Sequence, residues 1–319
     1  MSPIPKSTAD PLRIGVVGTG ALGRHHVRIL AELSRDDGDR TRLMGIHDAR
    51  PQVAEELAQA HGTRVFPDVA SLADEVDAMV VAVPTVDHGA VALPLLERGI
   101  HVLVEKPIAP SLEEADRMVA AAGEDTVLAV GHVEFYNPAV QALLDLGVTA
   151  RFVEIQRLSP FTRRSLDIDV ILDLMIHDLQ ILHALDPSPV AEVRATGIPV
   201  LSPLIDIANA RVELESGCVA NITASRVSAE KVRKLRVFGT NSYSSLDYQE
   251  QEIKRYRLAA GGAEPKILED PPKVTPYEPL KAEAEAFLRA CRGEEGRWVD
   301  GAAGRQALAT ALSLVAAIC

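Results

Sequence analysis

Between residues 12 and 131 the sequence alternates short, almost uninterrupted apolar runs with longer stretches of helical periodicity. The apolar runs are RIGVVG, RLMGIHD, AMVVAVP, IHVLVEK and TVLAVGH, and the helical stretches between them are ALGRHHVRILAEL, PQVAEELAQAHG, HGAVALPLLERG and SLEEADRMVAAAG. Strands covered on both faces require nearly continuous apolar sequence, and parallel strands require helical crossovers. The pattern therefore predicts an α/β domain over residues 1–131, built on a doubly wound parallel sheet.

After residue 150 the pattern changes to apolar and polar residues in alternation. The segments AEVRATGI, DIANARVELESG, CVANITASR, KLRVFGTNSYSSLDY and QEIKRYRLA are separated by turn signals such as ESG and GTNS. Alternation of this kind is typical of antiparallel strands with one packed face and one free face. We therefore expect residues 132–319 to form an α+β domain with a large, mostly antiparallel open sheet and terminal helices from about residue 278.

Composition narrows the classes of partner. The 319 residues are 47% hydrophobic, and 33 Lys and Arg face 45 Asp and Glu, which gives a formal charge of -12. A net negative chain disfavours nucleic-acid phosphate or an anionic membrane surface as its main partner. The N-terminus has no apolar leader, and we expect no run long enough to span a bilayer. These features predict a cytoplasmic protein without nucleic-acid or membrane partners.

The three cysteines, Cys218, Cys291 and Cys319, lie far apart without paired spacing. Neither a disulfide framework nor a zinc site is indicated by such spacing, and we expect no bound metal.

A glycine motif follows the first apolar run directly. Gly18, Gly20 and Gly23 have G-x-G-x-x-G spacing at the point where a strand gives way to a helix. This spacing is typical of a phosphate cradle, in which the first glycine permits a tight turn, the second lets pyrophosphate approach, and the third lets helix and strand pack closely. Asp48, at the end of the second run, could bind the adenosine ribose and favours NAD, although Arg50 could tolerate NADP. The alternative for Asp48 is an ordinary turn residue.

The fourth apolar run ends abruptly in Glu105, Lys106 and Pro107. One interpretation is a solvated loop after a strand. The other is a catalytic lysine delivered to the carboxyl end of the sheet, where open α/β sheets bind their ligands.

A second candidate group lies in LDIDVILDLMIHDLQILHAL. Asp173 and His177 are four residues apart, so on a helix they share one face, and most residues between them are apolar. A buried Asp/His pair is suited to proton transfer, although a hydrogen-bonded core pair without catalytic function is an equal alternative. We expect Asp169 to be an N-cap, Asp178 to be solvated, and His183 to be an ordinary core or edge histidine.

Four motifs together resemble the Gfo/Idh/MocA family, named for glucose-fructose oxidoreductase and inositol dehydrogenase. They are GTGALG, VEKP, GHVEFYNP and DLMIHD, and the resemblance extends over essentially the whole chain. It implies an N-terminal Rossmann domain, a C-terminal domain whose open sheet mediates a homodimer or homotetramer, and hydride transfer between NAD(P) and a sugar or cyclitol hydroxyl. NAD is expected rather than NADP.

The resemblance also assigns functions to residues. Lys106 would bridge the substrate hydroxyl and the nicotinamide, His177 would be the general acid/base, and Asp173 would orient the substrate or the histidine. Pro107 would follow a cis peptide bond. The residues expected to bind the cofactor are Gly18, Thr19, Gly20, Ala21, Leu22, Gly23, Asp48, Pro84, Thr85, His88, Glu105 and Lys106.

Two positions depart from the family pattern. Phe135 stands where many members have arginine, and Gln180 stands where a second aspartate is common. These departures affect the expected substrate contacts more than the expected chemistry.

The segment RLSPFTRRSLDIDVILDLMIHD most resembles family members that act on nucleotide sugars, in particular oxidases of the 3-hydroxyl of UDP-N-acetylglucosamine. Arg163 and Arg164 would suit a substrate diphosphate there, beside Lys106, Asp173 and His177. A cyclitol or free-sugar dehydrogenase is an alternative, and so is a non-catalytic protein that senses a dinucleotide. The three catalytic candidates together favour an enzyme.

Overall fold

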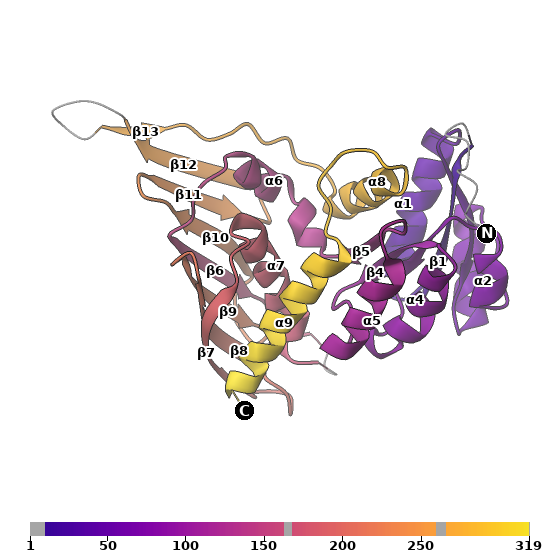
Figure 1. Ribbon diagram of the computed structural model, residues 1–319, viewed down its shortest axis with the longest axis horizontal. Coiled ribbons are helices and arrows are strands. Elements are labelled where there is room, and N and C mark those ends of the chain that lie inside the picture. Colours follow the sequence, from indigo (N-terminus) through magenta and orange to yellow (C-terminus); the bar gives the residue numbers. More distant parts are fainter. Residues whose placement is uncertain (1–9, 163–167, 260–265, 319) are drawn as a thin grey trace. The chain divides into compact units, whose positions relative to one another are not determined.

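The computed structural model describes residues 10–162, 168–259 and 266–318. They form two compact units: residues up to 131 together with Leu280–Arg305, and His132–Pro279 together with residues 306–319. Figure 1 shows the elements of both units. The expected boundary after residue 131 is present, but the expected second domain was contiguous to residue 319, whereas residues 280–305 group with the first unit. Arg163 and Arg164 lie outside the described residues.

The first unit contains a five-stranded parallel sheet in the order β2-β1-β3-β4-β5. Its strands match the five apolar runs: β1 (Leu12–Val17), β2 (Thr41–His47), β3 (Ala78–Val81), β4 (His101–Glu105) and β5 (Leu128–Gly131). The chain leaves β1 for β2 on one side and later returns to β3 on the other. The crevice beyond the carboxyl end of β1 is therefore the topological switch point, where folds of this class bind ligands.

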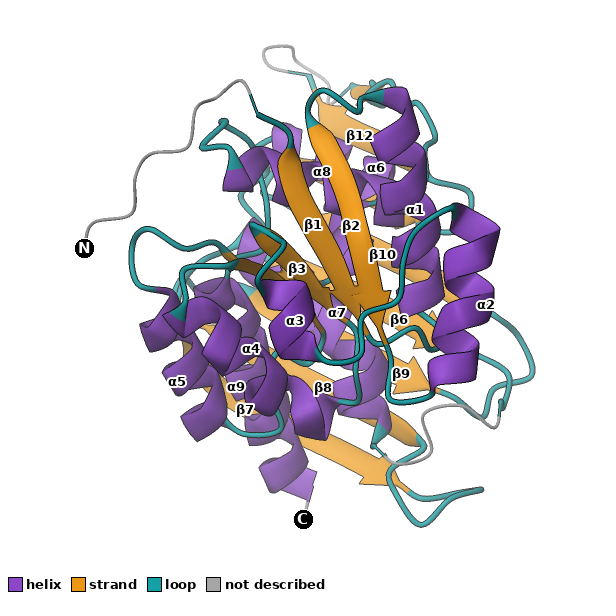
Figure 2. Cartoon of the chain, turned by 90° about the vertical axis from the view of Figure 1, so that its right-hand side faces the viewer, coloured by secondary structure: helices purple, strands orange, loops and turns teal. Residues whose placement is uncertain are grey.

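Helices connect these strands as the periodicity predicted, with two short additions. They are α1 (Gly23–Asp36), α2 (Pro51–His61), α3 (Val69–Ala73), the 3₁₀ turn η1 (Thr85–Asp87), α4 (His88–Glu97) and α5 (Leu112–Ala122), and α8 (Pro279–Cys291) joins the unit from the end of the chain. In Figure 2, α1 and α2 lie along β2, while α4 packs against α5. The short α3 and η1 lack the length that makes helical periodicity recognisable.

The second unit contains an eight-stranded sheet in the order β13-β12-β11-β10-β6-β9-β8-β7. Its strands are β6 (Phe152–Leu158), β7 (Val190–Ile198), β8 (Ile207–Leu214), β9 (Val219–Ser225), β10 (Val232–Phe238), β11 (Ser242–Asp247), β12 (Glu252–Leu258) and β13 (Ile267–Glu269). All neighbours are antiparallel except β6 and β9. A mostly antiparallel sheet was predicted, and the structure confirms it.

One face of this sheet is covered by helical elements, and the core lies between them. These elements are the 3₁₀ turn η2 (Val133–Tyr136), α6 (Pro138–Asp145), the π-helical turn η3 (Ile171–Met175), α7 (Ile176–Leu185) and the C-terminal part of α9 (Gly301–Ile318). The burial pattern of β6 alternates strictly, and β8 and β9 alternate over most of their length. Each of these strands thus turns alternate side chains into the core, as the sequence alternation indicated.

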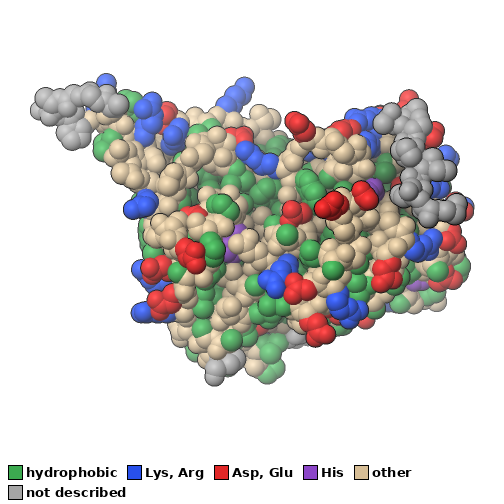
Figure 3. Space-filling model, in the orientation of Figure 1, with side chains coloured by type: hydrophobic (Ala, Val, Ile, Leu, Met, Phe, Trp, Pro, Cys, Tyr) green, Lys and Arg blue, Asp and Glu red, His purple; other side chains and the backbone are tan. Residues whose placement is uncertain are grey.

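The expectation about membrane-length runs needs a correction. The helix α9 is long and apolar enough to cross a bilayer by length and composition alone. Core helices of soluble proteins pass the same test, and Ala307, Leu308, Ala311 and Leu314 on this helix are fully buried. On the face drawn in Figure 3, acidic and basic side chains are interspersed without a continuous basic area.

His183 lies in the core of the second unit, as expected for a packing residue. Its Nε2 lies 2.9 Å from Thr310 Oγ1, and Gln306 Nε2 donates to its Nδ1 over 3.3 Å. These partners fit a neutral imidazole. Burial outweighs the attraction of Asp186 and lowers the pKa of His183 to about 4.

We predict that this histidine makes stability depend on acid. Below about pH 6.5, His183 binds a proton in the unfolded chain but stays neutral in the folded chain. The free energy of unfolding therefore falls as pH falls from about 6.5 to about 4. The loss would reach about 3 kcal/mol. Urea unfolding of wild type and His183→Gln between pH 7 and pH 4 measures it, and the variant should have a shallower slope. Parallel slopes would contradict the prediction.

Candidate active site

The glycine loop between β1 and α1 has the geometry that its sequence predicted. Gly18 has a φ of +87°, and a Cβ there would lie 2.6 Å from the backbone of Ala82 at the end of β3. A Cβ on Gly23 would lie 1.9 Å from the carbonyl oxygen of Gly18. At Gly20, by contrast, the nearest atom to such a Cβ is Arg50 Nη2 at 4.0 Å. Two glycines thus allow close backbone packing, and the third leaves open space above the loop.

The N-terminus of α1 is suited to hold an anion in that space. Its first turn contains no acidic residue, and Leu22 at the N-cap makes no side-chain capping bond. Two other helices of the unit are capped: Asp68 caps α3, and Ser111 caps α5, which also has acids in its first turn. The helices α2 and α4 have no side-chain cap either, but they do not follow the glycine loop. A helix start without acidic residues presents the positive end of the helix dipole, which favours a pyrophosphate. The residues present therefore fit a dinucleotide.

Asp48, directly after β2, is buried and held by the same loop. Its Oδ2 accepts hydrogen bonds from the backbone nitrogen and Oγ1 of Thr19, both at 2.7 Å, and its Oδ1 accepts from the backbone nitrogen and Nε of Arg50. Burial alone would raise the pKa of Asp48, but these hydrogen bonds outweigh it and hold the pKa well below its usual range. Asp48 is thus an ionised acceptor beside the cradle, whereas the Arg50 side chain is mostly exposed.

Lys106 follows β4 directly, at the same carboxyl edge of the sheet, and is half-buried. The peptide bond between Lys106 and Pro107 is cis, which confirms that prediction. His88 packs beneath this segment, where its Nδ1 lies 2.9 Å from the carbonyl oxygen of Pro107 and its Nε2 lies 3.1 Å from that of Val83. The His88 ring thus joins the loop after β3 to the segment after Lys106, and direct contact with a cofactor stays a prediction.

Other cofactor candidates of the first unit vary in exposure. Pro84 and Ala21 are exposed, Thr85 and Leu22 are half-buried, and Thr19 is fully buried. Pro84 and Thr85 begin η1, beyond the carboxyl end of β3, so both lie at the ligand-binding edge of the sheet. Glu105, by contrast, turns inward: it is 7% exposed and bonds to His26 on α1.

Asp173 and His177 belong to the second unit, where a regular α-helix was expected. Asp173 instead lies in the π-helical turn η3, in which the backbone nitrogen of Ile176 bonds to the carbonyl oxygen of Ile171, and His177 is the second residue of α7. A π turn needs more than four residues and an α turn needs 3.6, so residues four apart share a face in either geometry. Isolated π turns occur frequently at functional sites.

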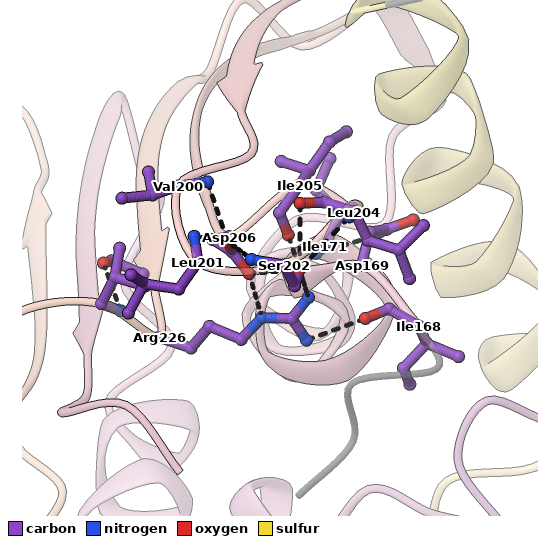
Figure 4. A network of polar contacts seen from close by, with 12 residues as sticks. Ile168, Asp169, Ile171, Val200, Leu201, Ser202, Leu204, Ile205, Asp206 and Arg226 are labelled. Carbon is purple, nitrogen blue, oxygen red and sulfur yellow. Dashed lines mark hydrogen bonds and ion pairs between the residues drawn. The ribbon is translucent and has the colours of Figure 1, made fainter. Parts of the chain in front are cut away.

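The start of this helical segment is anchored strongly. Asp169 Oδ1 accepts from the backbone nitrogens of Ile171 and Leu172, which confirms the predicted N-cap. Directly before it, the carbonyl oxygen of Ile168 accepts from Nη1 of the buried Arg226 at 2.8 Å (Figure 4).

Arg226 is held in turn by the buried Asp206. Asp206 accepts a hydrogen bond from Nε of Arg226 at 2.8 Å. It also accepts hydrogen bonds from three successive backbone nitrogens, those of Val200, Leu201 and Ser202 (Figure 4). Burial opposes ionisation of Asp206, but these donors outweigh it and lower its pKa. The network ties the β7–β8 loop to the residue that precedes the helix cap.

His177 is 8% exposed and packs edge-on against His132, with ring centroids 5.5 Å apart. His132 is fully buried and is the second residue of the GHVEFYNP motif. Nothing in the spacing of the sequence linked this histidine to a helix 45 residues away.

The expectation that Asp178 is solvated is wrong. Asp178 is fully buried and pairs with both Nε and Nη2 of Arg157, at 2.8 and 2.6 Å, while Nη1 of Arg157 donates to Glu134 at 2.7 Å. Burial penalises the guanidinium, but the two carboxylates outweigh this and raise the pKa of Arg157. Buried charges persist only when paired, and the partner here comes from β6, at a separation that no local pattern reveals. Gln180 and Phe135, the two departures, are buried in the same unit.

Comparison with known proteins agrees with these features. Residues 12–132 match an oxidoreductase family with an NAD-binding Rossmann fold, and residues 140–243 match the Gfo/Idh/MocA C-terminal domain. A UDP-N-acetylglucosamine 3-dehydrogenase from Acidithiobacillus ferrooxidans is 39% identical over 96% of this chain and 97% of its own length. An inositol 2-dehydrogenase from Acidothermus cellulolyticus is 30% identical over 59% of this chain and 58% of its own length.

Solved structures give the same result. A structure of the Acidithiobacillus ferrooxidans enzyme superposes with a TM-score of 0.88 at 37% identity, covering 96% of this chain and 97% of that one. Levoglucosan dehydrogenase in complex with NADH and levoglucosan has a TM-score of 0.83 at 18% identity, with 97% of each chain covered, and so shares the fold. With this fold, this cradle and these matches, the chain belongs to the Gfo/Idh/MocA family of NAD-binding oxidoreductases.

Proposed function

We propose that this protein is an NAD-dependent dehydrogenase that oxidises a secondary hydroxyl of a nucleotide sugar, with the 3-hydroxyl of UDP-N-acetylglucosamine as its substrate. The observation that carries the proposal is the 39% identity, over nearly the full length of both chains, to an enzyme of that name. The chain retains a lysine after β4 and an Asp/His pair on a buried helical segment. A protein that only senses a dinucleotide needs none of these three residues.

The reaction assigns a task to each of these residues. When bound, NAD supplies the hydride acceptor at C4 of its nicotinamide. The hydroxyl proton must leave as the hydride departs, and the imidazole of His177 accepts it. The ammonium of Lys106 stabilises the negative charge that develops on the oxygen. Asp173 orients the substrate or His177. In the reverse direction the same groups protonate a ketone.

The cofactor is held by the loop and helix start already described. The N–H groups at the start of α1 and the open space at Gly20 take the pyrophosphate, with Ala21, Leu22 and Gly23 completing the loop. Asp48 accepts the ribose hydroxyls. Because the oxygens of Asp48 already accept from Thr19 and Arg50, the ribose would displace the exposed Arg50 guanidinium and leave the Thr19 bonds in place. Pro84 and Thr85 complete the cofactor contacts, and the buried His88 and Glu105 support the cofactor site from within through their bonds to the segment after Lys106 and to α1.

Three further parts of the proposal rest on the sequence and on the open sheet. Arg163 and Arg164 bind the substrate diphosphate through charge-assisted hydrogen bonds. A homodimer or homotetramer forms through the sheet of the second unit, where Phe152, Phe238, Tyr243 and Tyr256 make a continuous row of ring contacts. Aromatic rows are typical of buried association surfaces. The protein works in the cytoplasm.

A substrate screen tests the function. Initial rates of NADH formation should be measured with UDP-N-acetylglucosamine, UDP-glucose, free N-acetylglucosamine, glucose 6-phosphate and myo-inositol. We expect turnover with UDP-N-acetylglucosamine and little or none with the free sugar or the cyclitol, because these lack the diphosphate. Turnover with inositol alone would establish the cyclitol alternative. NAD binding without turnover on any of these would favour the sensor.

Replacement of the catalytic residues should separate chemistry from cofactor binding. We expect Lys106→Ala and His177→Ala each to lower kcat by about 10²–10⁴-fold, the usual contribution of a proton-transfer group, with the NAD dissociation constant nearly unchanged. Single-turnover kinetics and fluorescence titration with NADH measure the two effects. The controls are Lys254→Ala, at an exposed lysine on β12, and His183→Gln, on the same helix as His177. Normal turnover in both site variants would refute the assigned roles.

Loss of the Asp48 carboxylate should change cofactor preference. Asp48→Ala removes a charged acceptor of ribose hydroxyls, which is worth about 1.5–3 kcal/mol, so the NAD dissociation constant should rise about 10–100-fold. The substitution also frees the Arg50 guanidinium, which could then bind a 2'-phosphate. The affinity for NADP should therefore fall less than the affinity for NAD, or increase. Calorimetric titration with both cofactors gives the ratio. An unchanged ratio would place the ribose elsewhere.

A further inference from the structure

A buried polar cluster in the first unit joins three elements that are remote in sequence. His26 on α1, Glu105 at the end of β4 and Glu283 on α8 each offer one nitrogen or oxygen atom, and these three atoms lie within 4.8 Å of one another. His26 and Glu283 are fully buried and Glu105 is 7% exposed. Two carboxyl groups and an imidazole thus share a buried site, and one of them belongs to the residue that precedes Lys106.

The hydrogen-bond partners of the His26 ring indicate which of its two nitrogens carries a proton. His26 Nε2 lies 2.7 Å from Glu105 Oε1, whereas its Nδ1 is buried without a hydrogen-bond partner among the described residues. A doubly protonated ring would bury an N–H group without an acceptor, which is costly. The ring is therefore neutral and donates from Nε2 to the Glu105 carboxylate.

Glu283 must carry a proton of its own. Both of its carboxyl oxygens are buried, and neither has a hydrogen-bond partner among the described residues. Burial, together with the neighbouring Glu105 carboxylate, raises the pKa of Glu283 well above its usual range. Two ionised carboxylates cannot stay so close in an apolar interior. The Glu283 carboxyl is then neutral, and the acceptor available to its proton is the Glu105 carboxylate, one oxygen of which lies within 4.8 Å of a Glu283 oxygen.

The space around Glu105 is restricted on its remaining side. Gly131 lies opposite Glu105 in the pairing of β4 with β5, and a Cβ there would lie 2.8 Å from Glu105 Oε2. The Glu105 carboxylate is thus enclosed by β5, by α1 and by α8. Since Glu105 is the covalent neighbour of Lys106, its position sets where the lysine leaves the sheet.

We propose that Glu283 is a positioning residue that acts, as a neutral hydrogen-bond donor and together with His26, on the Glu105 carboxylate and through it on Lys106. The proposal rests on the catalytic role of Lys106 proposed above. It also links α1, the helix that begins at the phosphate cradle, to the strand end that presents the lysine. The cluster needs no metal ion, because the proton on Glu283 already removes the repulsion between its carboxyls.

Two variants separate positioning from packing. Glu283→Gln retains a neutral donor of the same shape, and we expect its kcat to stay close to that of wild type. Glu283→Met fills the same volume without a donor, so Glu105 and with it Lys106 should shift. Because small displacements of a catalytic group lower the rate strongly, we expect kcat to fall at least about tenfold. The Tm of Glu283→Met should equal or exceed that of wild type, because apolar replacement of a buried ionisable group is often neutral or stabilising. Glu285→Met on the same helix is the matched control.

The results that would overturn the proposal are specific. One is a Glu283→Met enzyme with normal kcat. Another is a loss of kcat that follows a loss of Tm and is equally large in Glu283→Gln. Stoichiometric metal in the purified protein, lost in Glu283→Gln, would replace the shared-proton explanation with a metal site.

A readout without substrate keeps this test apart from the proposed function. In lysine-labelled protein, the Lys106 resonance, assigned by its absence in Lys106→Ala, should shift in Glu283→Met and not in Glu283→Gln. Infrared spectra should show the carbonyl stretch of a protonated carboxyl that Glu283→Gln lacks. If no sugar is oxidised but both signals behave as expected, the substrate assignment fails and the positioning role stands. An unmoved resonance overturns the positioning role whatever the substrate.

Discussion

The first unit depends on one close approach between backbones. The loop after β1 comes so near to the end of β3 and to the start of α1 that Gly18 and Gly23 have no room for a Cβ. This approach turns the chain sharply at the switch point of the sheet and points the N-terminus of α1 at the space above Gly20. The buried Asp48 then bonds to the same loop through Thr19. If either close contact opened, the helix start, the loop and the carboxylate would lose their common geometry.

Buried polar side chains also hold neighbouring elements in place, and their charges are neutralised in a different way in each unit. In the second unit, charges are neutralised by pairing: Arg157 with Asp178, and Arg226 with Asp206. These pairs fix the elements around the helical segment that carries Asp173 and His177. In the first unit, no cation pairs with Glu283 among the described residues, and burial beside Glu105 raises its pKa and so favours the protonated form. Pairing and protonation both avoid an uncompensated charge in an apolar interior. In each unit, the buried groups lie next to the backbone segment that carries a candidate catalytic side chain.

Sequence patterns predicted much of this because they reflect local physics. Continuous apolar runs located all five strands of the parallel sheet, and alternation located most strands of the larger sheet, since side-chain direction along a strand has a period of two. The cradle followed from backbone sterics at three glycines. The errors share a cause as well. Asp178 was expected to be solvated and α8 was expected in the second domain. Both outcomes are set by contacts with residues far away in the chain.

The sequence by itself determined the fold class, the cradle, the lysine after β4 and the Asp/His spacing, because each of these depends on residues within one or two turns or strands. Only the tertiary structure decided which polar residues are buried together. His26, Glu105 and Glu283 are separated by 79 and 178 positions, and nothing in the residues around any of them marks the other two as partners. Their protonation depends on distance and on exclusion of water, and both quantities exist only once the chain has folded.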